Sequence, residues 1–546
     1  MSEENGTGEP LDEESRRWFL KSVAGASAAF GAIPGLIAGT ASEVSAQKEA
    51  PSKALGSRAD AARQVRVAAA QRQYDRPSVQ HPVNGDESQY PQRLGNFSKA
   101  LPHNNLGEVD LNAYDALLTA VGSEDPADYD SIPLGGTTKL ANPLAANSWI
   151  LEGPDSHSMS MPAPPSLASY TESGEMLEVY WQAVLRDVPF AEYTANNAVT
   201  QAVRELGRYP QFRTVTSNTL FRGETEGDGV GPYISQFLQK PIPFGAGTIE
   251  QRYRVPVAGD DHMTDFTGWL DIQNGAAPAA SNTMDPTPRF LRNGRDIGEF
   301  VHQDTPSQAY YSAALIMSGW GTAALSDSNP YLNSLNQDAF VQFGTPHIID
   351  MVTKAAVAAL KCAWFQKWNV HRRLRPESFA GLVQNQITGA SSYPIKVYFD
   401  GSAALETIFN QTGTYLLPMA YPEGSPTHPS YPAGHAAVAG ACATMLKAFF
   451  NEDFEVPVPV QASTDGLSLV PYNGAPLTIG NEINKLAANI SLARDFAGVH
   501  WRSDGIEGMN LGERVAIQIL RDYANTYSEI FSGFSFRRFN GTEVSI

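Results

Sequence analysis

The most informative segment of the chain is THPSYPAGHA, residues 427–436, which leads into an apolar run that ends near Phe450. Its two prolines force a non-helical approach, after which Gly434 and His435 open a helix predicted over 436–451. The unpaired N–H groups at a helix start favour an anion, and Gly434 allows its close approach. His435 adds a tunable proton at the same place. We therefore expect an anion site here, although an ordinary helix start with a surface histidine would show the same residues.

A second block, KWNVHRRLRPE at 367–377, closes a helix predicted over 348–373. Pro376 disfavours the helical conformation at Arg375, so the helix should end there. Lys367, His371 and Arg375 follow one another at intervals of four and are expected broadly on one face. Taken alone, this pattern is more typical of a basic, solvated helix end that complements the helix dipole.

The third block is RDFAGVHWRSDG, residues 494–505. Arg494 and His500 would lie on different faces of a continuous helix. Gly498 permits a break, after which both side chains could point into one pocket; a core histidine near a structural arginine is the alternative. Together the three blocks supply a lysine, two arginines, two histidines and a helix N-terminus. This set suits a tetrahedral, multiply charged oxyanion and is a poor cage for a divalent cation.

Apolar residues recur at helical spacing around these blocks. They predict helices over 296–319, 348–373, 436–451, 481–496 and 503–527, with further helices at 61–74 and within 175–206. Strand signals, such as QRYRV at 251–255, are sparse. The sequence therefore predicts a mainly α fold, with a helical bundle core, long loops and few short strands.

The N-terminus has a different composition. SRRWFLK at 15–21 resembles a twin-arginine export signal, and small residues suited to cleavage end at Ala46. A membrane anchor is the alternative, but the glycine, serine and threonine content disfavours a stable span. We expect four regions: a signal peptide (1–46), a linker and N-terminal arm (47–110, flexible over 47–65), a loop-rich helical region (111–295) and a helical catalytic region (296–546). The protein should be periplasmic or extracellular, with no stable membrane insertion after cleavage.

Composition excludes several classes of protein. The 546 residues carry a net charge of −19, which argues against nucleic acid or an anionic membrane as the main partner. Only Cys362 and Cys442 are present, so a disulfide scaffold or a cysteine-based metal site is excluded. Both lie in apolar helical stretches, where they could pair or remain buried thiols.

The order K…RP, P-x-GH and R-x5-H resembles the superfamily shared by vanadium haloperoxidases, type-2 phosphatidic acid phosphatases and bacterial acid phosphatases. The interval from Lys367 to Arg375 is eight residues, where the phosphatases and the fungal-type chloroperoxidases have seven. With KW-x-VHR, HPSYP and GVH-x-R-x-DG, the chain resembles the algal-type vanadium bromoperoxidases and their bacterial relatives. The motifs cover residues 367–505.

This resemblance implies a vanadate cofactor bound through His500, the residue that matches the family's vanadium ligand. Side chains of Lys367, Arg375 and Arg494 and the N–H of Gly434 match the groups that bind the vanadate oxygens. His435 matches the acid–base histidine, so the catalytic set is His435, His500 and Lys367. His428 matches a histidine outside the vanadate contacts that favours bromide or iodide over chloride. Asp304 and Asp504 are our candidates for carboxylates that orient these groups.

The implied reaction uses hydrogen peroxide to oxidise a halide to hypohalous acid, which halogenates small organic acceptors. The family's bromoperoxidases also form oligomers, and residues 60–75 and 175–206 are candidate interface helices, so we expect a homo-oligomer. One residue departs from the family pattern: Ala433 replaces a serine that bonds a vanadate oxygen. Its loss removes one hydrogen bond, worth about 0.5–1.5 kcal/mol net.

Two alternatives remain. Phosphate is also tetrahedral, so the same residues could serve a phosphatase in which His500 becomes phosphorylated and His435 protonates the leaving group. The Lys367–Arg375 interval and His428 favour the peroxidase over this phosphatase. A non-catalytic oxyanion-binding protein would be expected to lack the acid–base histidine, which is present here.

Overall fold

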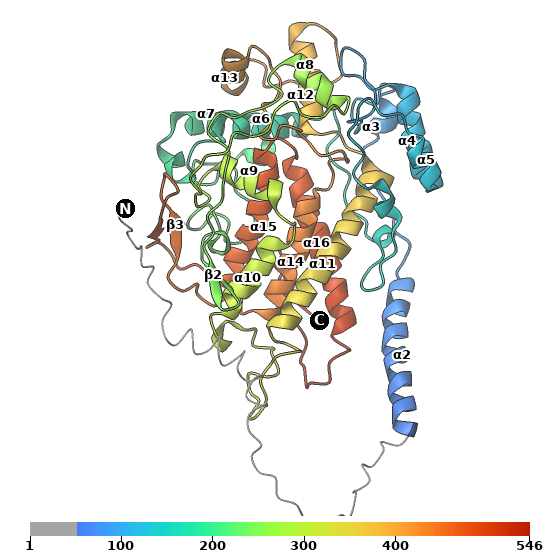
Figure 1. The fold of residues 1–546 in the computed structure, drawn as a ribbon, viewed down its shortest axis with the longest axis vertical. Coiled ribbons are helices and arrows are strands. Elements are labelled where there is room, and N and C mark those ends of the chain that lie inside the picture. The colour runs from blue at the N-terminus through green and yellow to red at the C-terminus, as the bar shows by residue number, and fades with distance from the viewer. Residues whose placement is uncertain (1–51) are drawn as a thin grey trace, which may run out of the picture.

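The computed structural model describes residues 52–546, so the predicted export signal lies outside the described residues. Long helices form the centre of the molecule and confirm the mainly α prediction (Figure 1). The central bundle consists of α11 (Thr345–Phe365), α14 (Gly434–Phe449), α15 (Ile479–Phe496) and α16 (Arg502–Tyr523). Two shorter helices, α9 (Gly294–Gln303) and α10 (Gln308–Ser318), lie against it. In the bundle, α14 packs against α11, α15 and α16, and it also contacts α10.

Small residues bring α14 and α16 into backbone contact. A Cβ at Gly440 would collide with the Met509 carbonyl group, and one at Gly512 with the carbonyl oxygen of Ala437. Larger side chains at these positions would therefore force the helices apart. This close packing fixes the start of α14 beside the start of α16, where the Ala433 N–H donates to the Asp504 carbonyl at 3.0 Å.

Shorter elements surround the bundle. Three separate antiparallel hairpins supply the strands of the described chain, as the sparse strand signals predicted: β1 (Ile242–Phe244) with β2 (Gly247–Ile249), β3 (Val460–Ala462) with β4 (Leu469–Pro471), and β5 (Ser535–Arg537) with β6 (Glu543–Ser545). The remaining helices are α2 (Ser52–Tyr74), α3 (Asp86–Gln89), α4 (Leu111–Ser123), α5 (Pro126–Asp130), α6 (Tyr170–Leu185), α7 (Asn197–Leu206), α8 (Phe266–Gln273), α12 (Pro376–Thr388) and α13 (Ala403–Thr412). Residues 251–255 form no strand, since only an isolated bridge links Tyr253 to Arg289.

Two predicted helices have different limits. The helix expected over 296–319 is broken between α9 and α10, where Asp304 adopts an extended conformation. The helix expected over 348–373 ends as α11 at Phe365 and continues as a π-helical turn, Gln366–His371. Arg372 then leaves the helix in the left-handed region, with φ 44°. The extra residue per turn of a π-helix is not visible in a 3.6-residue pattern.

The N-terminal region also departs from expectation. Helix α2 begins at Ser52, so the flexible linker expected over 47–65 is wrong for its second part. This helix is largely exposed and stands apart from the bundle (Figure 1), joined to it by an ion pair between Arg72 and Asp522 at 3.0 Å.

The segment 175–206 is not a free interface helix along its length. Nearly all of α6 is buried, and its Met176 and Trp181 belong to one continuous hydrophobic core that also contains residues of α14 and α15. Cys362 and Cys442 are buried free thiols. Across residues 52–546, no helix is both long enough and apolar enough to cross a membrane.

Candidate active site

The cationic residues of the three sequence blocks converge at the N-terminal end of α14. Burial and mutual repulsion lower the pKa of His500, because three cations surround it: Arg375, Lys367 and Arg494. The same causes lower the pKa of Lys367 and of His428. We call this group the cage; its members are Lys367, Arg375, His428, Gly434, His435, Arg494 and His500.

Lys367 enters the cage from the π-helical turn after α11. Its Nζ is fully buried and donates to the carbonyl oxygens of Pro429 and Ser430, each at 2.7 Å. An ammonium group has three protons, so one donor remains for a ligand. Wide π-helical turns often occur at functional sites, and this one sets the direction of Lys367.

The same turn corrects the expectation for His371. The left-handed conformation of Arg372 breaks the helix between His371 and Arg375, so the three residues do not follow one continuous helical face. Its ring packs edge-on against Tyr431 instead, with the centroids 4.8 Å apart. Burial lowers the pKa of His371 to about 3, so it is a neutral packed ring.

Arg375 lies at the centre of the cage and is completely buried. The proline that follows places it in the extended conformation immediately before α12, as the pre-proline rule predicts. Its guanidinium donates to the carbonyl oxygen of Val499 at 2.7 Å and lies 2.9 Å from Nε2 of His500. A third contact joins it to Nδ1 of His428 at 3.0 Å. Burial lowers the pKa of Arg375 to about 9.

His500 is held by a carboxylate on the first turn of α16. Its Nδ1 donates to Oδ2 of Asp504 at 2.8 Å, so the lone pair lies on Nε2, the nitrogen that faces Arg375. Ser430 and the N–H of Trp501 donate to the same carboxylate. The structure thus places Asp504 where the sequence analysis expected an orienting carboxylate, and His500 presents an unprotonated nitrogen to the cage.

Arg494 reaches the cage from the last turn of α15, and the predicted break at Gly498 is confirmed, with φ 83°. Its Nη1 donates to the Val301 carbonyl oxygen at 3.0 Å, and its guanidinium lies over the Tyr421 ring, 5.5 Å from the centroid. The Nε of Arg494 is buried and has no partner among the described residues. It is a hydrogen-bond donor left for a ligand.

His435 lies in the first turn of α14 and bonds Asp304, the other expected carboxylate. Its Nε2 is 2.9 Å from Oδ1 of Asp304, which leaves Nδ1 to accept a proton. Burial, together with Arg494, lowers the pKa of His435, while Asp304 opposes this effect. Ala433 occupies the N-cap position and makes no side-chain capping bond, so the first N–H groups of α14, from Gly434 onward, lack an intrahelical acceptor.

The structure adds residues that the sequence analysis did not assign. Arg373 donates to Asp504 at 2.8 Å and also pairs with Glu172 and Glu175 on α6, all of them buried. Burial raises the pKa of Glu172 to about 8. Glu172 and Glu175 lie about 200 positions before Arg373, so the sequence does not indicate that they pair with it. The one local signal is the helical spacing of the acidic residues within 172–178, which predicts a shared helix face but not its partner. Ser430 is the other addition, because it bonds the carboxylate that orients His500.

The residues present fit a tetrahedral oxyanion such as vanadate or phosphate. The cage offers the third proton of Lys367, the free Nε of Arg494 and the unbonded start of α14 as donors. Nε2 of His500 carries a lone pair that Arg375 contacts at 2.9 Å and would have to give up to a ligand. A bound anion would also relieve the repulsion between the cage cations. Fold and site together define a helical-bundle protein with a buried oxyanion cage.

Comparisons with known proteins identify the family. A family model described as the VCPO second helical-bundle domain matches residues 347–529. The vanadium-dependent bromoperoxidase of Ascophyllum nodosum is 35% identical over 90% of this chain and 92% of its own length. That of Corallina pilulifera is 34% identical over 91% of this chain and 100% of its own. The homohexameric structure of the second vanadate-dependent bromoperoxidase of Ascophyllum nodosum (AnII) superposes with a TM-score of 0.85, at 30% identity and over 95% of each chain. The chain belongs to the vanadium-dependent haloperoxidase family, on its algal bromoperoxidase side.

Proposed function

We propose that this chain is a vanadate-dependent haloperoxidase that uses hydrogen peroxide to oxidise bromide or iodide. The observation that carries the proposal is the His500–Asp504 pair, which points a lone pair into a cage of three cations. The relatives named vanadium-dependent bromoperoxidases support the same activity. The product would be hypohalous acid, which halogenates small organic acceptors.

The resemblance to the family suggests a role for each cage residue. His500 would hold vanadate through Nε2, while Lys367, Arg375, Arg494 and the Gly434 N–H would bind its oxygens. Bound vanadate would supply a Lewis acid that polarises hydrogen peroxide. His435 has a lowered pKa, so it is neutral near pH 7 and can take a proton from incoming peroxide at Nδ1.

We propose that His428 contributes to the halide preference. It is buried, bonds Arg375 and lies against Trp364, with the ring centroids 4.6 Å apart. Its pKa is lowered by burial and by Lys367, so the ring is neutral in the absence of a bound anion. The resemblance to bromoperoxidases at this position supports bromide and iodide over chloride.

Reconstitution with orthovanadate tests the activity. Metal-stripped protein should brominate a phenol-type indicator dye only after vanadate is added, and phosphate should compete for the cage. His500→Ala should abolish this vanadate-dependent bromination. Hydrolysis of p-nitrophenyl phosphate by the apo form, without any bromination after reconstitution, would instead establish the phosphatase alternative.

We also propose export through the twin-arginine pathway and assembly into a homo-oligomer. Residues Arg16 and Arg17 support export, and replacing both with lysine should leave the protein in the cytoplasm. The homohexameric relative supports assembly. Helix α2 is exposed and its sequence carries five basic residues and one acidic residue, on a chain of net charge −19. Light scattering on a form lacking residues 47–75 should show a smaller oligomer if α2 contributes to the interface.

A further inference from the structure

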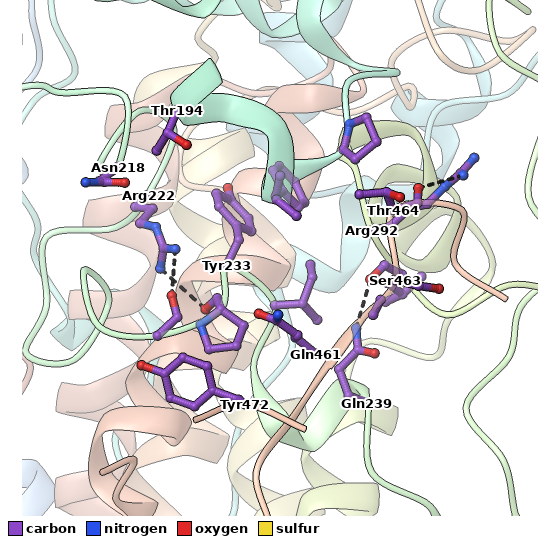
Figure 2. A pocket seen from close by; sticks show the side chains of 18 of the residues that line it. Thr194, Asn218, Arg222, Tyr233, Gln239, Arg292, Gln461, Ser463, Thr464 and Tyr472 are labelled. Atoms are coloured by element: carbon purple, nitrogen blue, oxygen red, sulfur yellow. Dashed lines mark hydrogen bonds between the residues drawn. The ribbon is translucent and has the colours of Figure 1, made fainter. Parts of the chain in front are cut away.

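A second pocket of about 400 Å³ lies outside the cage (Figure 2). Its walls come from residues 189–194, from the loop over 218–239, from residues 291–292 and from β3 with the residues that follow it. No cage residue lines it. The volume is within the range of small-molecule sites, roughly 300–1,000 Å³.

The charges on the pocket wall are positive. Arg222 and Arg292 are its only charged residues, and Figure 2 shows them on opposite sides. Arg222 donates to backbone carbonyl oxygens, those of Asp228 at 2.6 Å and Gly231 at 2.9 Å. Arg292 pairs through Nε with Asp296 at 3.3 Å, and its Nη1 donates to the Thr464 carbonyl oxygen at 3.1 Å. The lining itself contains two guanidinium groups and no carboxylate, which favours an anionic ligand over a cationic one.

The same wall carries aromatic rings. Phe190 and Tyr233 stack with their centroids 3.6 Å apart and their planes 9° apart. Phe190 is only partly buried, so one side of the stack remains accessible. Tyr472 lies across the pocket in Figure 2, and Leu291 adds apolar surface. Offset or edge-on packing of another ring against such a pair is favourable beyond the burial of its apolar surface.

One polar group in the pocket lacks a partner. Gln239 is 1% exposed, and its Nε2 donates to the Leu291 carbonyl oxygen at 2.8 Å. Its Oε1 is buried and accepts no hydrogen bond from the described chain. Such an acceptor is normally satisfied, so a ligand that brings a hydroxyl donor would remove its desolvation cost.

We propose that this pocket binds a small phenolic carboxylate, independently of the cage. The carboxylate meets Arg292, the ring packs against Phe190, and the hydroxyl donates to Gln239. Binding does not depend on the proposed peroxidase activity. Only the further idea that the bound phenol is a halogenation acceptor rests on that proposal.

Calorimetry with 4-hydroxybenzoate tests the site on protein preloaded with orthovanadate, which occupies the cage. One site with a Kd below about 1 mM is expected. Arg292→Gln should weaken binding at least tenfold. Arg289→Gln is the matched control: Arg289 lies three residues earlier and bonds the same hairpin at Asp465, at 2.7 Å, but does not line the pocket. The affinity of Arg289→Gln for 4-hydroxybenzoate should stay within twofold of that of the wild type.

A comparison of ligands needs no variant. On the wild-type protein, 4-hydroxybenzamide has the same shape without the charge and should bind at least tenfold more weakly. Equal affinities for the two ligands would overturn the anionic class. Binding that disappears when vanadate is loaded would place the ligand in the cage and overturn the separate site. The absence of any heat at millimolar ligand would do the same.

Discussion

Replacing Asp504 with asparagine should weaken vanadate binding without unfolding the protein. Asp504 Oδ2 accepts the Nδ1 proton of His500, while Oδ1 accepts from Arg373 at 2.8 Å. An asparagine has one oxygen and one NH2 group. If its oxygen faces His500, its NH2 meets the Arg373 guanidinium. If its NH2 faces His500, the ring must carry its proton on Nε2, the nitrogen needed for the vanadium.

The magnitude follows from the lost contact. A hydrogen bond to a charged group contributes about 1.5–3 kcal/mol, and each 1.4 kcal/mol is tenfold in affinity, so vanadate should bind about 10- to 100-fold more weakly. Loss of a comparable outer carboxylate costs a similar factor at other metal sites, roughly 10–100-fold. Arg373 keeps Glu172 and Glu175 as partners, so the bundle should remain folded.

The assay titrates orthovanadate into apo protein and follows recovery of bromination. Glu507→Gln is the matched control, because it removes a carboxylate one turn later on α16 that lines a surface pocket away from His500. Circular dichroism checks the fold of both variants. A vanadate affinity of Asp504→Asn within twofold of the wild type, in folded protein, would refute the idea that Asp504 sets the tautomer of His500.

Three further predictions concern the surroundings of the cage. Ala433→Ser restores a hydroxyl at the start of α14 and should tighten vanadate binding about 2- to 10-fold, measured by the same titration; unchanged affinity would remove our account of this departure. Asp304→Asn removes the group that raises the pKa of His435, so the acidic limb of the kcat/KM–pH profile should move to lower pH, and a shift to higher pH would contradict the pairing. Burial lowers the pKa of His302, but its bonds to Glu299 and Glu423 outweigh this effect and raise the pKa to about 9. Protonated His302 therefore contributes fully to the free energy of unfolding below about pH 6.5, and this contribution is lost as pH rises through 9. Between pH 6.5 and 9.5 the free energy of unfolding, measured in urea, should fall by about 2 kcal/mol more for the wild type than for His302→Gln, after allowance for partial exposure. If the free energies of the two proteins changed in parallel with pH, this role of His302 would be excluded.

The sequence predicted the bundle because its core helices are long and periodic. The helices expected over 436–451, 481–496 and 503–527 match α14, α15 and α16 within a few residues. Periodicity failed where the backbone leaves α-helical geometry, at the break after α9 and at the π-helical turn that carries Lys367. The helix predicted over 61–74 matches the second part of α2, but its first part, from Ser52, was missed because small and polar residues there resemble a linker when no packed face marks a helix.

The cage itself could be predicted because its members lie in three short motifs with fixed spacing, and one glycine, Gly498, marks the turn that brings His500 beside Arg494. The buried ion pairs that surround the cage could not be predicted from the sequence. Glu172 and Glu175 reach Arg373 from α6, which is distant in sequence and buried for reasons of packing, and a charge pattern on one helix does not specify its partner on another. The three carboxylates depend on the one buried guanidinium, since removing the cation would leave them without a partner in a low dielectric. Substituting Arg373 with leucine should therefore reduce both the free energy of unfolding and the affinity for vanadate. Asp504→Asn should reduce the affinity alone, so comparing the two variants distinguishes residues that stabilise the fold from those that orient His500.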